Sequence, residues 1–317
     1  MNETFKSNGK LLLTGEYLVL DGALALAIPT KYGQHMTVAE SENSPLHWQS
    51  YDHEGKLWYQ GHFGLTDQGE FTVLQTGPMD AVSRQLVTLL NSCLKLNPDF
   101  AKTASFSRVK TGLDFPRDWG LGSSSTLINN LAQWVKVDAF KLLDEGFGGS
   151  GYDIACASSY TPLTYKITQD GGRAISSVNL NWNFTDELYF IHLNRKQDSK
   201  QGIKDYRDRN TDIKQAIHEL DKLTSELVTL SDLPAFESTL SKHENLISTV
   251  LGRPTIKEEL FPDYKLGVIK SLGAWGGDFI LASGGQGAAE YFRSKGYSTI
   301  IPFEEMIIKK PPKLIQP

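Results

Sequence analysis

Cysteine is scarce in this sequence, and that limits the class of protein it can encode. Of the 317 residues only two, Cys93 and Cys156, are cysteines, and they stand far apart. This excludes a disulfide framework and a cysteine-based zinc site, and it favours a reducing, cytoplasmic environment. The histidines also lack the spacing of a metal site, as the run His35, His47, His53 and His62 illustrates.

Long apolar runs and tracts of one charge are missing as well. No apolar segment approaches the ~20 residues that cross a membrane, and the N-terminal MNETFKSNGK lacks the basic-then-apolar pattern of a secretion signal. Basic residues form no tract, and the formal net charge is −5. We therefore expect a small-molecule substrate and neither a nucleic-acid nor a membrane partner. The oligomeric state leaves no signal in the sequence.

What is present is the composition of a globular protein, with 40% hydrophobic and 22% charged residues. Its most informative segment is Pro116 to Trp134, PRDWGLGSSSTLINNLAQW. Two glycines precede a run of hydroxyl side chains, and apolar residues then recur at helical spacing. The pattern predicts a glycine loop that leads into an amphipathic helix. Such a helix N-terminus offers unpaired N–H groups to a phosphate, although an ordinary loop with a serine cap is the alternative.

This glycine loop matches neither of two common phosphate-binding motifs. No lysine follows Gly122, as it would in a Walker P-loop, and the third glycine of a dinucleotide fingerprint is missing. A lysine must therefore come from elsewhere. Lys10 stands at the edge of a short apolar segment, Leu11 to Leu13, which we expect to be a buried strand. Asp21-Gly22 predicts a hairpin turn into a second strand that Pro29 would end.

Two further segments carry candidate polar groups. In GGSGYDIACASS, from Gly148 to Ser159, glycines surround the single acidic residue Asp153. It could be an acidic group held near the glycine loop, or a helix cap formed by Ser150 or Asp153. Further on, NRKQDSKQGIKDYRDR is typical of a solvated helix face, although Lys196, Ser199 and Lys200 are placed where a loop could reach an anionic substrate.

Three stretches, in order along the chain, resemble the GHMP kinase superfamily. They are GKLLLTGEY, GLGSSST and SLGAWGGDF. Within that superfamily the details are most similar to phosphomevalonate kinases: GEY stands where mevalonate kinases commonly have GEH, SGYDIA resembles SGFDVA, and GAWGGDF resembles GAGGGDC. Trp275, Leu272 and Ser125 depart from the family pattern, and these departures bear on the substrate more than on the fold.

The resemblance implies an α/β (α+β) fold of two domains with the active site in the cleft between them. Residues 1–165 would form the ATP-binding domain, a mixed sheet with helices. Residues 166–317 would form a ferredoxin-like domain.

The resemblance also implies site residues. The ATP phosphates would be wrapped by Gly120, Leu121, Gly122, Ser123, Ser124 and Ser125, and either Ser123 or Ser124 would hold Mg²⁺. Lys10 and Asp153 would be the catalytic pair, with Asp153 either a base or an orienting group. The substrate side would comprise Glu16, Tyr17, Ser150, Gly151, Lys200, Gly276, Gly277 and Asp278. A glutamate that some relatives use as a metal ligand aligns with Leu142, so this ligand is either absent or supplied by Asp144 or Glu145.

The activity implied is that of an ATP- and Mg²⁺-dependent kinase of the mevalonate pathway of isoprenoid biosynthesis. Phosphomevalonate is the favoured acceptor and mevalonate the second choice. A sugar or homoserine kinase, or a catalytically silent relative that binds a nucleotide or metabolite, are the alternatives.

Overall fold

The chain divides into two compact units. The computed structural model describes residues 2–41, 45–74, 77–195, 199–208, 213–273 and 275–308. The first unit comprises Met1–Gly9, Tyr32–Arg117 and Leu121–Ser158, and the second comprises Lys10–Lys31, Asp118–Gly120 and Ser159–Pro317. Each unit therefore contains segments from distant parts of the sequence. The expected domain boundary after residue 165 stays a prediction.

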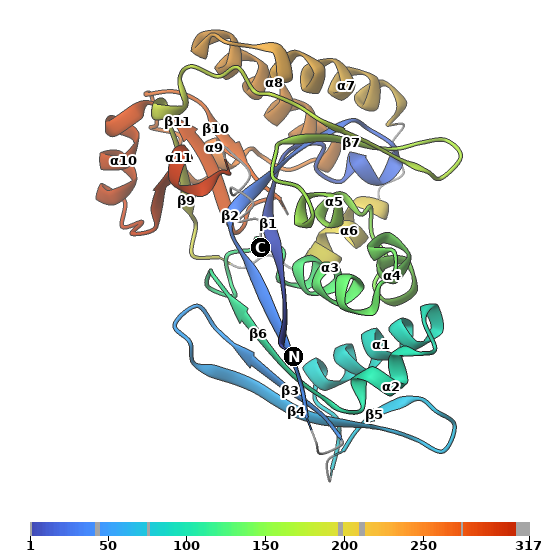
Figure 1. Ribbon diagram of the computed structural model, residues 1–317. Coiled ribbons are helices and arrows are strands. Elements are labelled where there is room, and N and C mark those ends of the chain that lie inside the picture. The colour runs from blue at the N-terminus through green and yellow to red at the C-terminus, as the bar shows by residue number, and fades with distance from the viewer. Residues whose placement is uncertain are drawn as a thin grey trace. The chain divides into compact units, whose positions relative to one another are not determined.

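A mixed sheet forms the first unit (Figure 1). The pairs β2–β6, β3–β4 and β4–β5 are antiparallel, whereas β3 and β6 are parallel. Alternating apolar and polar residues define the faces of a strand but not its direction, so they do not predict this parallel pair. In hydrogen-bonded order the strands are β5 (Phe71–Val73), β4 (Leu57–Leu65), β3 (Leu46–Tyr51), β6 (Ser107–Leu113) and β2 (Ala25–Glu40), with β1 (Asn2–Thr14) also paired to β2.

The connection between β1 and β2 differs from the expected hairpin. A short 3-10 helix, Leu18–Asp21, follows β1 and is capped by Gly22, which has a left-handed φ of 86°. Strand β2 continues past Pro29 to Glu40, so the expectation that Pro29 ends the strand is wrong. Proline removes only its own N–H from a ladder, and a long strand can continue where that N–H is not needed.

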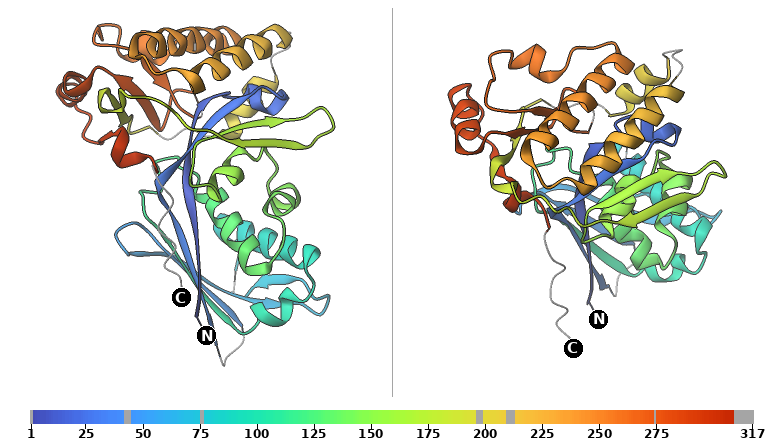
Figure 2. Two further views of the ribbon diagram at one scale, coloured as in Figure 1. Left: turned by 45° about the horizontal axis from the view of Figure 1, so that its top comes forward. Right: turned by 90° about the horizontal axis from the view of Figure 1, so that it is seen from above.

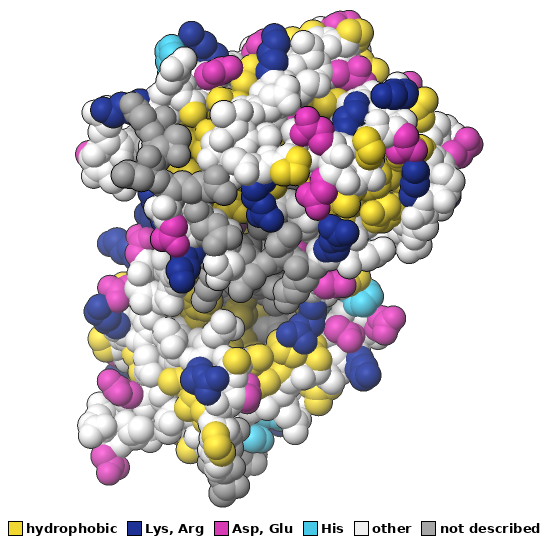
Figure 3. All heavy atoms as spheres, turned by 180° about the vertical axis from the view of Figure 1, so that it is seen from behind, with side chains coloured by type: hydrophobic (Ala, Val, Ile, Leu, Met, Phe, Trp, Pro, Cys, Tyr) yellow, Lys and Arg dark blue, Asp and Glu magenta, His cyan; other side chains and the backbone are white. Residues whose placement is uncertain are grey.

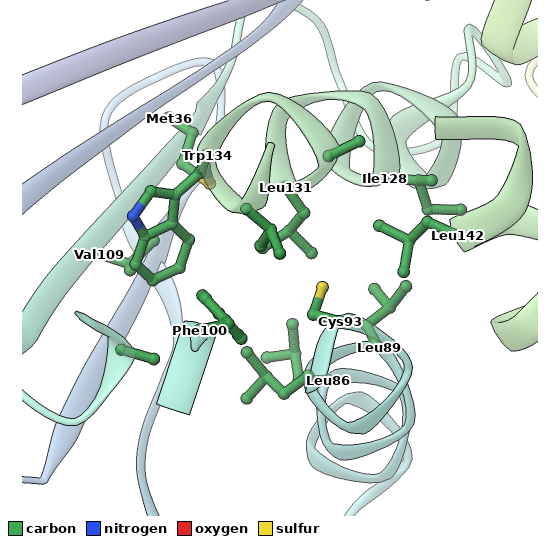
Figure 4. Packing of buried hydrophobic residues seen from close by; sticks show 14 of the residues in the cluster. Met36, Leu86, Leu89, Cys93, Phe100, Val109, Ile128, Leu131, Trp134 and Leu142 are labelled. Atoms are coloured by element: carbon green, nitrogen blue, oxygen red, sulfur yellow. The ribbon is translucent and has the colours of Figure 1, made fainter. Parts of the chain in front are cut away.

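Helices cover one face of the first sheet (Figure 1). They are α1 (Ala81–Leu96), α2 (Phe100–Ala104), α3 (Ser123–Val135), α4 (Ala139–Gly146) and α5 (Tyr152–Ala157). In Figure 4, Ile128 and Leu131 of α3 point toward Leu86 and Leu89 of α1. This is the apolar face that the helical spacing predicts, and its burial provides the core of the unit.

The second unit contains a four-stranded antiparallel sheet. Its order is β10 (Ile269–Ser271), β11 (Phe279–Ser283), β9 (Leu188–His192) and β12 (Ile300–Pro302). Helices α7 (Lys214–Thr229) and α8 (Leu233–Leu251) come between β9 and β10, and α10 (Gly285–Ser294) comes between β11 and β12. Strand, helices, strand, strand, helix, strand is the ferredoxin-like order, which confirms the fold predicted for this part of the chain.

Smaller elements complete the second unit. Helices α7 and α8 lie side by side in both views of Figure 2. The hairpin β7 (Leu163–Ile167) and β8 (Arg173–Ser177) pairs with the start of β2 through Ala25 and Tyr165. The remaining helices are α6 (Ser199–Arg207), α9 (Ile256–Leu260), α11 (Phe303–Met306) and a 3-10 turn at Thr185–Glu187. None of the described helices is both long and apolar enough to cross a membrane.

Truncating Leu131 tests the core of the first unit. Leu131 is fully buried between α3 and α1. We expect Leu131→Ala to lower the free energy of unfolding by about 2–5 kcal/mol, because the loss of apolar contacts adds to the cost of the cavity left behind. Urea unfolding measures the change. Leu74→Ala is the control, since half of the Leu74 side chain is exposed, and an equal loss in both variants would contradict the packing described.

Candidate functional site

The glycine loop and the start of α3 form as the sequence predicts. Gly120 and Gly122 have left-handed φ values of 64° and 91°, and α3 begins at Ser123, directly after Gly122. The Gly122 carbonyl accepts hydrogen bonds from the Thr126 N–H at 3.0 Å and from the Ser125 hydroxyl at 2.9 Å. The first N–H groups of a helix have no acceptor within it, so they are available to an anion.

The three loop serines differ in what their hydroxyls can reach. The Ser125 side chain is 2% exposed and donates to the loop carbonyl, so it stabilises the turn. Ser124 is exposed and Ser123 partly exposed. Ser123 and Ser124 are therefore the hydroxyls that a phosphate or Mg²⁺ could contact, and this metal assignment stays a prediction.

A buried polar network fixes α3 to β1 and β2. The Ser7 hydroxyl donates to Asn130 Oδ1 at 2.7 Å and accepts from the Asn129 amide at 2.8 Å. The Asn130 amide donates to the Gln34 carbonyl at 3.1 Å, and Thr126 donates to the Gln34 side chain at 3.2 Å. Satisfied buried networks of this kind give an element one defined position. The signal for it is the Asn129-Asn130 pair among the apolar residues Ile128 and Leu131 of α3, and the sequence interpretation missed it.

Three motifs from distant parts of the sequence meet in the second unit. The Lys10 ammonium donates to the Gly120 carbonyl at 3.0 Å. A Cβ at Gly120 would lie 2.1 Å from the Asp278 carboxylate, so these two residues are in close contact. The lysine predicted to come from elsewhere is thus at the glycine loop, and the turn between β10 and β11 reaches the same point. The arrangement places a cation and a carboxylate beside the first residue of the loop.

Trp119 holds the entry of the glycine loop on the sheet of the second unit. Its indole packs edge-on against Phe279 of β11, with ring centroids 5.3 Å apart. The neighbouring Asp118 carbonyl lies 3.3 Å from Nε2 of His192, at the end of β9. An aromatic anchor of this kind restricts the positions that Gly120 can adopt. No spacing rule in the sequence distinguished Trp119 from the other tryptophans.

The turn after β1, residues 14–17 (the TGEY turn), contains a fully buried cluster of charged groups. Glu16 Oε1 accepts from the Lys270 ammonium, which also lies 3.0 Å from Glu244 Oε1. Ser271 donates to Glu244 Oε2 at 3.0 Å, and His243 Nε2 lies 3.3 Å from Glu16 Oε2. Glu16, His243 and Glu244 offer ligand atoms within 4.8 Å of one another. Because the Lys270 ammonium supplies positive charge to both carboxylates, we assign the group to a buried ion-pair cluster and not to a metal centre.

Burial sets the protonation of this cluster. It raises the pKa of Glu16 to about 7, against the opposing effect of Lys270, and it also raises the pKa of Glu244. Burial would lower the pKa of Lys270, but the two carboxylates outweigh it and raise that pKa, so the ammonium is charged. Burial, with Lys270 nearby, holds the pKa of His243 well below its ordinary value. The imidazole is then neutral, and its Nε2 accepts from the Gly15 N–H at 3.4 Å.

The Glu16 side chain points into this cluster and has no exposed surface. A direct contact of Glu16 with a substrate stays a prediction. The structure shows instead that the ion pair with Lys270 fixes the TGEY turn. Tyr17, the next residue, has a positive φ of 58°, which is strained for a residue with a side chain. Such strain persists only where the surroundings fix the backbone.

The charged segment after β9 forms α6, and this helix packs against the TGEY turn. Tyr206 stacks on Tyr17 with ring centroids 5.7 Å apart, and its hydroxyl donates to Asp21 at 2.6 Å. A Cβ at Gly202 would lie 2.5 Å from the Tyr17 hydroxyl. Lys200 belongs to this helix, although its side chain is not among those described, and Lys196 lies outside the described residues. The helix predicted for this segment is confirmed, although one side of it is packed through Tyr206 and not solvated; its role toward a substrate stays a prediction.

Asp153 is not a helix cap in the first unit. Gly151, with a left-handed φ of 90°, is the N-cap of α5, and Asp153 lies in its first turn. Asp153 Oδ1 accepts from the N–H of Ile154 at 3.0 Å. Ser150 is 7% exposed. The Asp153 carboxylate thus binds one N–H of the first turn of α5, and its catalytic assignment stays a prediction.

Two alternatives for a second metal ligand lie on α4. Leu142 is fully buried in the core of the first unit (Figure 4), so that position offers no ligand. Glu145 forms an ion pair with Lys95 at 2.5 Å, and Asp144 is exposed. On the turn after β10, Gly276 has a left-handed φ of 89°, Gly277 is buried, and Asp278 is partly exposed. A metal-ligand role for Asp144 or Glu145 stays a prediction. A substrate role for Gly276, Gly277 and Asp278 stays a prediction as well.

Comparisons with solved structures identify the fold. A phosphomevalonate kinase of Streptococcus pneumoniae, in complex with phosphomevalonate and AMPPNP, is 17% identical with a TM-score of 0.65, over 94% of this chain and 99% of that chain. The chain has the GHMP kinase fold. A mevalonate kinase of Methanococcus jannaschii (14% identity, TM-score 0.62, 93% and 94% covered) and a galactokinase of Lactococcus lactis complexed with galactose (13%, 0.66, 97% and 93%) are also similar. No protein-family model matches the chain, and no curated protein matches it in sequence.

These likenesses confirm the fold predicted from the three motifs. The GHMP kinase fold accommodates acceptors as different as phosphomevalonate and galactose in the solved structures. Identities of 13–17% show the fold alone. The acceptor must therefore be argued from residues of this chain.

The buried cluster predicts how stability depends on pH. The folded pKa of Glu16, about 7, lies above its ordinary value of 4.5, so the folded protein keeps a proton there that the unfolded chain releases. Stability from this group is present at low pH and is lost as pH rises from about 4.5 to 7, with a slope of up to about 1.4 kcal/mol per pH unit. The raised pKa of Glu244 acts in the same direction. The lowered pKa of His243 acts in the opposite direction, because below its ordinary pKa of 6.5 the unfolded chain takes up a proton that the folded protein does not. Lys270 stays charged throughout this window.

Glu16→Gln should make the slope of the free energy of unfolding against pH more positive than in wild type, because glutamine has no proton to lose and the decline from Glu16 is then missing. Urea unfolding at intervals between pH 5 and pH 7.5 measures the slope in both proteins. Glu145→Gln is the matched control, since it removes a partly exposed carboxylate of a surface ion pair and should leave the wild-type slope. Identical slopes in wild type and Glu16→Gln would refute the shifted pKa.

Proposed function

We propose that the protein is an ATP-dependent small-molecule kinase that also requires Mg²⁺. The observation that carries this proposal is the meeting of Lys10, Gly120 and Asp278 at the glycine loop before α3. Phosphoryl transfer depends on positioning and on neutralising charge at the phosphate oxygens. A loop of glycines with left-handed backbone, a helix N-terminus and a lysine supply donors for that purpose.

Each part of the loop has a distinct task in this proposal. The N–H groups from Gly122 to Ser125 would bind the phosphates of ATP, because the glycines allow the backbone to approach without a Cβ. Ser123 and Ser124, whose hydroxyls are accessible, would hold Mg²⁺, which would neutralise charge between the phosphates. Lys10 would meet the transferred phosphoryl group from its position at Gly120.

Asp153 is assigned to the same phosphoryl group by its match to the family motif. It would either accept the acceptor's proton or orient the acceptor and Lys10. A phosphate acceptor is already ionised and needs no strong base, whereas an alcohol gains more from one. The proposal is therefore that orientation dominates if the acceptor is phosphomevalonate.

We propose phosphomevalonate as the acceptor and mevalonate as the second choice. The support is the GEY, SGYDIA and GAWGGDF pattern together with the position of α6 against Tyr17. Lys200 and Lys204 lie on that helix, so a phosphate near Tyr17 would have ammonium groups in the same element. Charge-assisted hydrogen bonds to a dianion are strong enough to select a phosphorylated acceptor. On this proposal the enzyme would act in isoprenoid biosynthesis, in the cytoplasm.

Acceptor preference is the first prediction to measure. We expect ADP release, coupled to NADH oxidation, to be fastest with phosphomevalonate, slower with mevalonate and at background with homoserine and galactose. Omitting Mg²⁺ should abolish the signal. A higher kcat/KM with galactose would replace the pathway assignment while keeping the kinase. No ADP release with any acceptor would favour a silent relative.

Asp153→Asn and Lys10→Ala test the catalytic pair. We expect each to lower kcat by orders of magnitude with little change in ATP affinity, because their interactions matter mainly in the transition state. The double variant should be little worse than the worse single variant, since residues that act together are not additive. Steady-state kinetics and urea midpoints are measured on the same samples. Normal turnover of Asp153→Asn with a lowered midpoint would make Asp153 a structural residue.

A further inference from the structure

A lysine with no exposed surface lies in the middle of β10. Lys270 is flanked along the chain by Ile269 and Ser271, which are also buried. Burying an ammonium ion costs several kcal/mol unless it is paired and hydrogen-bonded. Lys270 meets both conditions, through the carboxylates of Glu16 and Glu244 and through the carbonyl of Ser271. A single residue therefore connects the turn after β1, helix α8 and strand β10.

The two turns that Lys270 connects both carry substrate-side residues of the proposed site. Glu16 immediately precedes Tyr17, whose positive φ requires support from its surroundings. Ser271 leads into the turn that ends at Asp278, which is also at positive φ and in contact with Gly120. Lys270 is thus tied to the strained Tyr17 turn directly, through Glu16, and to the turn that ends at Asp278 along the chain, through Ser271.

Charge within the cluster makes Lys270 hard to replace. Two carboxylates face this ammonium, and the nearby His243 is neutral because burial holds its pKa far below the ordinary value. Lys270 is therefore the positively charged member of the cluster. The Glu16 turn is also held by the Gly15 N–H to His243 bond of 3.4 Å, which is long. Removing the ammonium would leave like charges adjacent and the turn with weaker ties.

We propose that Lys270 is a positioning residue for acceptor binding: by pairing with Glu16 it keeps the Glu16–Tyr17 turn in register with the Gly276–Asp278 turn. The kinetic consequence rests on the proposed kinase function, whereas the order of the two turns does not. Loss of Lys270 acts on acceptor KM and kcat and leaves ATP binding largely intact, because the loop from Gly122 to Ser125 is held by α3 and its own polar network.

Three variants separate positioning from a general loss of stability. Lys270→Met/Glu244→Gln removes the ammonium together with one carboxylate, and at pH 6 the remaining Glu16 can take up a proton, which limits the buried charge. Glu244→Gln alone keeps the Lys270–Glu16 pair and is the matched control. Phe292→Leu weakens the aromatic core of α10, away from both turns, and controls for destabilisation. Hydrogen exchange and KM are also measured for Lys270→Met alone if this variant folds.

The first readout needs no substrate. Hydrogen exchange of the intact protein is followed in peptides that cover residues 14–20 and 271–279. We expect exchange in both peptides to rise at least about tenfold in Lys270→Met/Glu244→Gln and to match wild type in Glu244→Gln and Phe292→Leu. Wild-type protection of both peptides in the double variant would overturn the positioning role.

The second readout compares the change in acceptor KM with the change in ATP KM. With the preferred acceptor, we expect acceptor KM to rise about ten- to a hundredfold in the double variant while ATP KM stays within about twofold. An equal rise of both values, or the same profile in Phe292→Leu, would make Lys270 merely structural. If the wild type phosphorylates none of the acceptors, the proposed function fails, and the exchange result alone decides the role of Lys270.

Discussion

The close contact between a backbone and a carboxylate at Gly120 governs the candidate site. A Cβ there would lie 2.1 Å from Asp278 Oδ2, and the φ of 64° is one that side chains disfavour. Only glycine satisfies both conditions. Because Gly120 fits there, its carbonyl reaches the Lys10 ammonium and the chain turns into Leu121 and Gly122.

The second unit contains charged groups in two different environments. At Gly120 the polar groups are partly exposed, so a ligand can exchange places with solvent there. At Lys270 the ion pairs are sealed from water, and their role is to fix backbone segments. Buried pairs seldom add net stability over apolar packing, but breaking one partner is costly, so they fix conformation strongly. A binding site needs partly exposed polar groups that contact a ligand, and buried ion pairs that fix the backbone around it.

The sequence predicted the elements whose signals are local. The sequence predicts a helix from Leu233 to Leu251 that Asp232 could cap; α8 has these bounds, and Asp232 accepts from the Ala235 N–H. The glycine loop and α3 also form where the spacing places them. Motif order along the chain also indicated the GHMP kinase fold.

Features that depend on distant partners escaped prediction. Lys270 sits in an apolar strand segment, and nothing local shows that Glu16 and Glu244 neutralise it. The parallel pairing of β3 with β6 and the continuation of β2 through Pro29 depend in the same way on which strand lies beside them. Trp119 gains its role only from Phe279.

The discontinuous second unit has a consequence for how the chain is made. Its segments Lys10–Lys31 and Asp118–Gly120 leave the ribosome long before Ser159–Pro317 is complete. Glu16 is 254 residues from Lys270, and the Gly15 N–H is 228 residues from its acceptor on His243. Contacts of such long sequence separation form late and fold slowly. During synthesis the Glu16 carboxylate must therefore stay in water until the chain has emerged as far as Lys270.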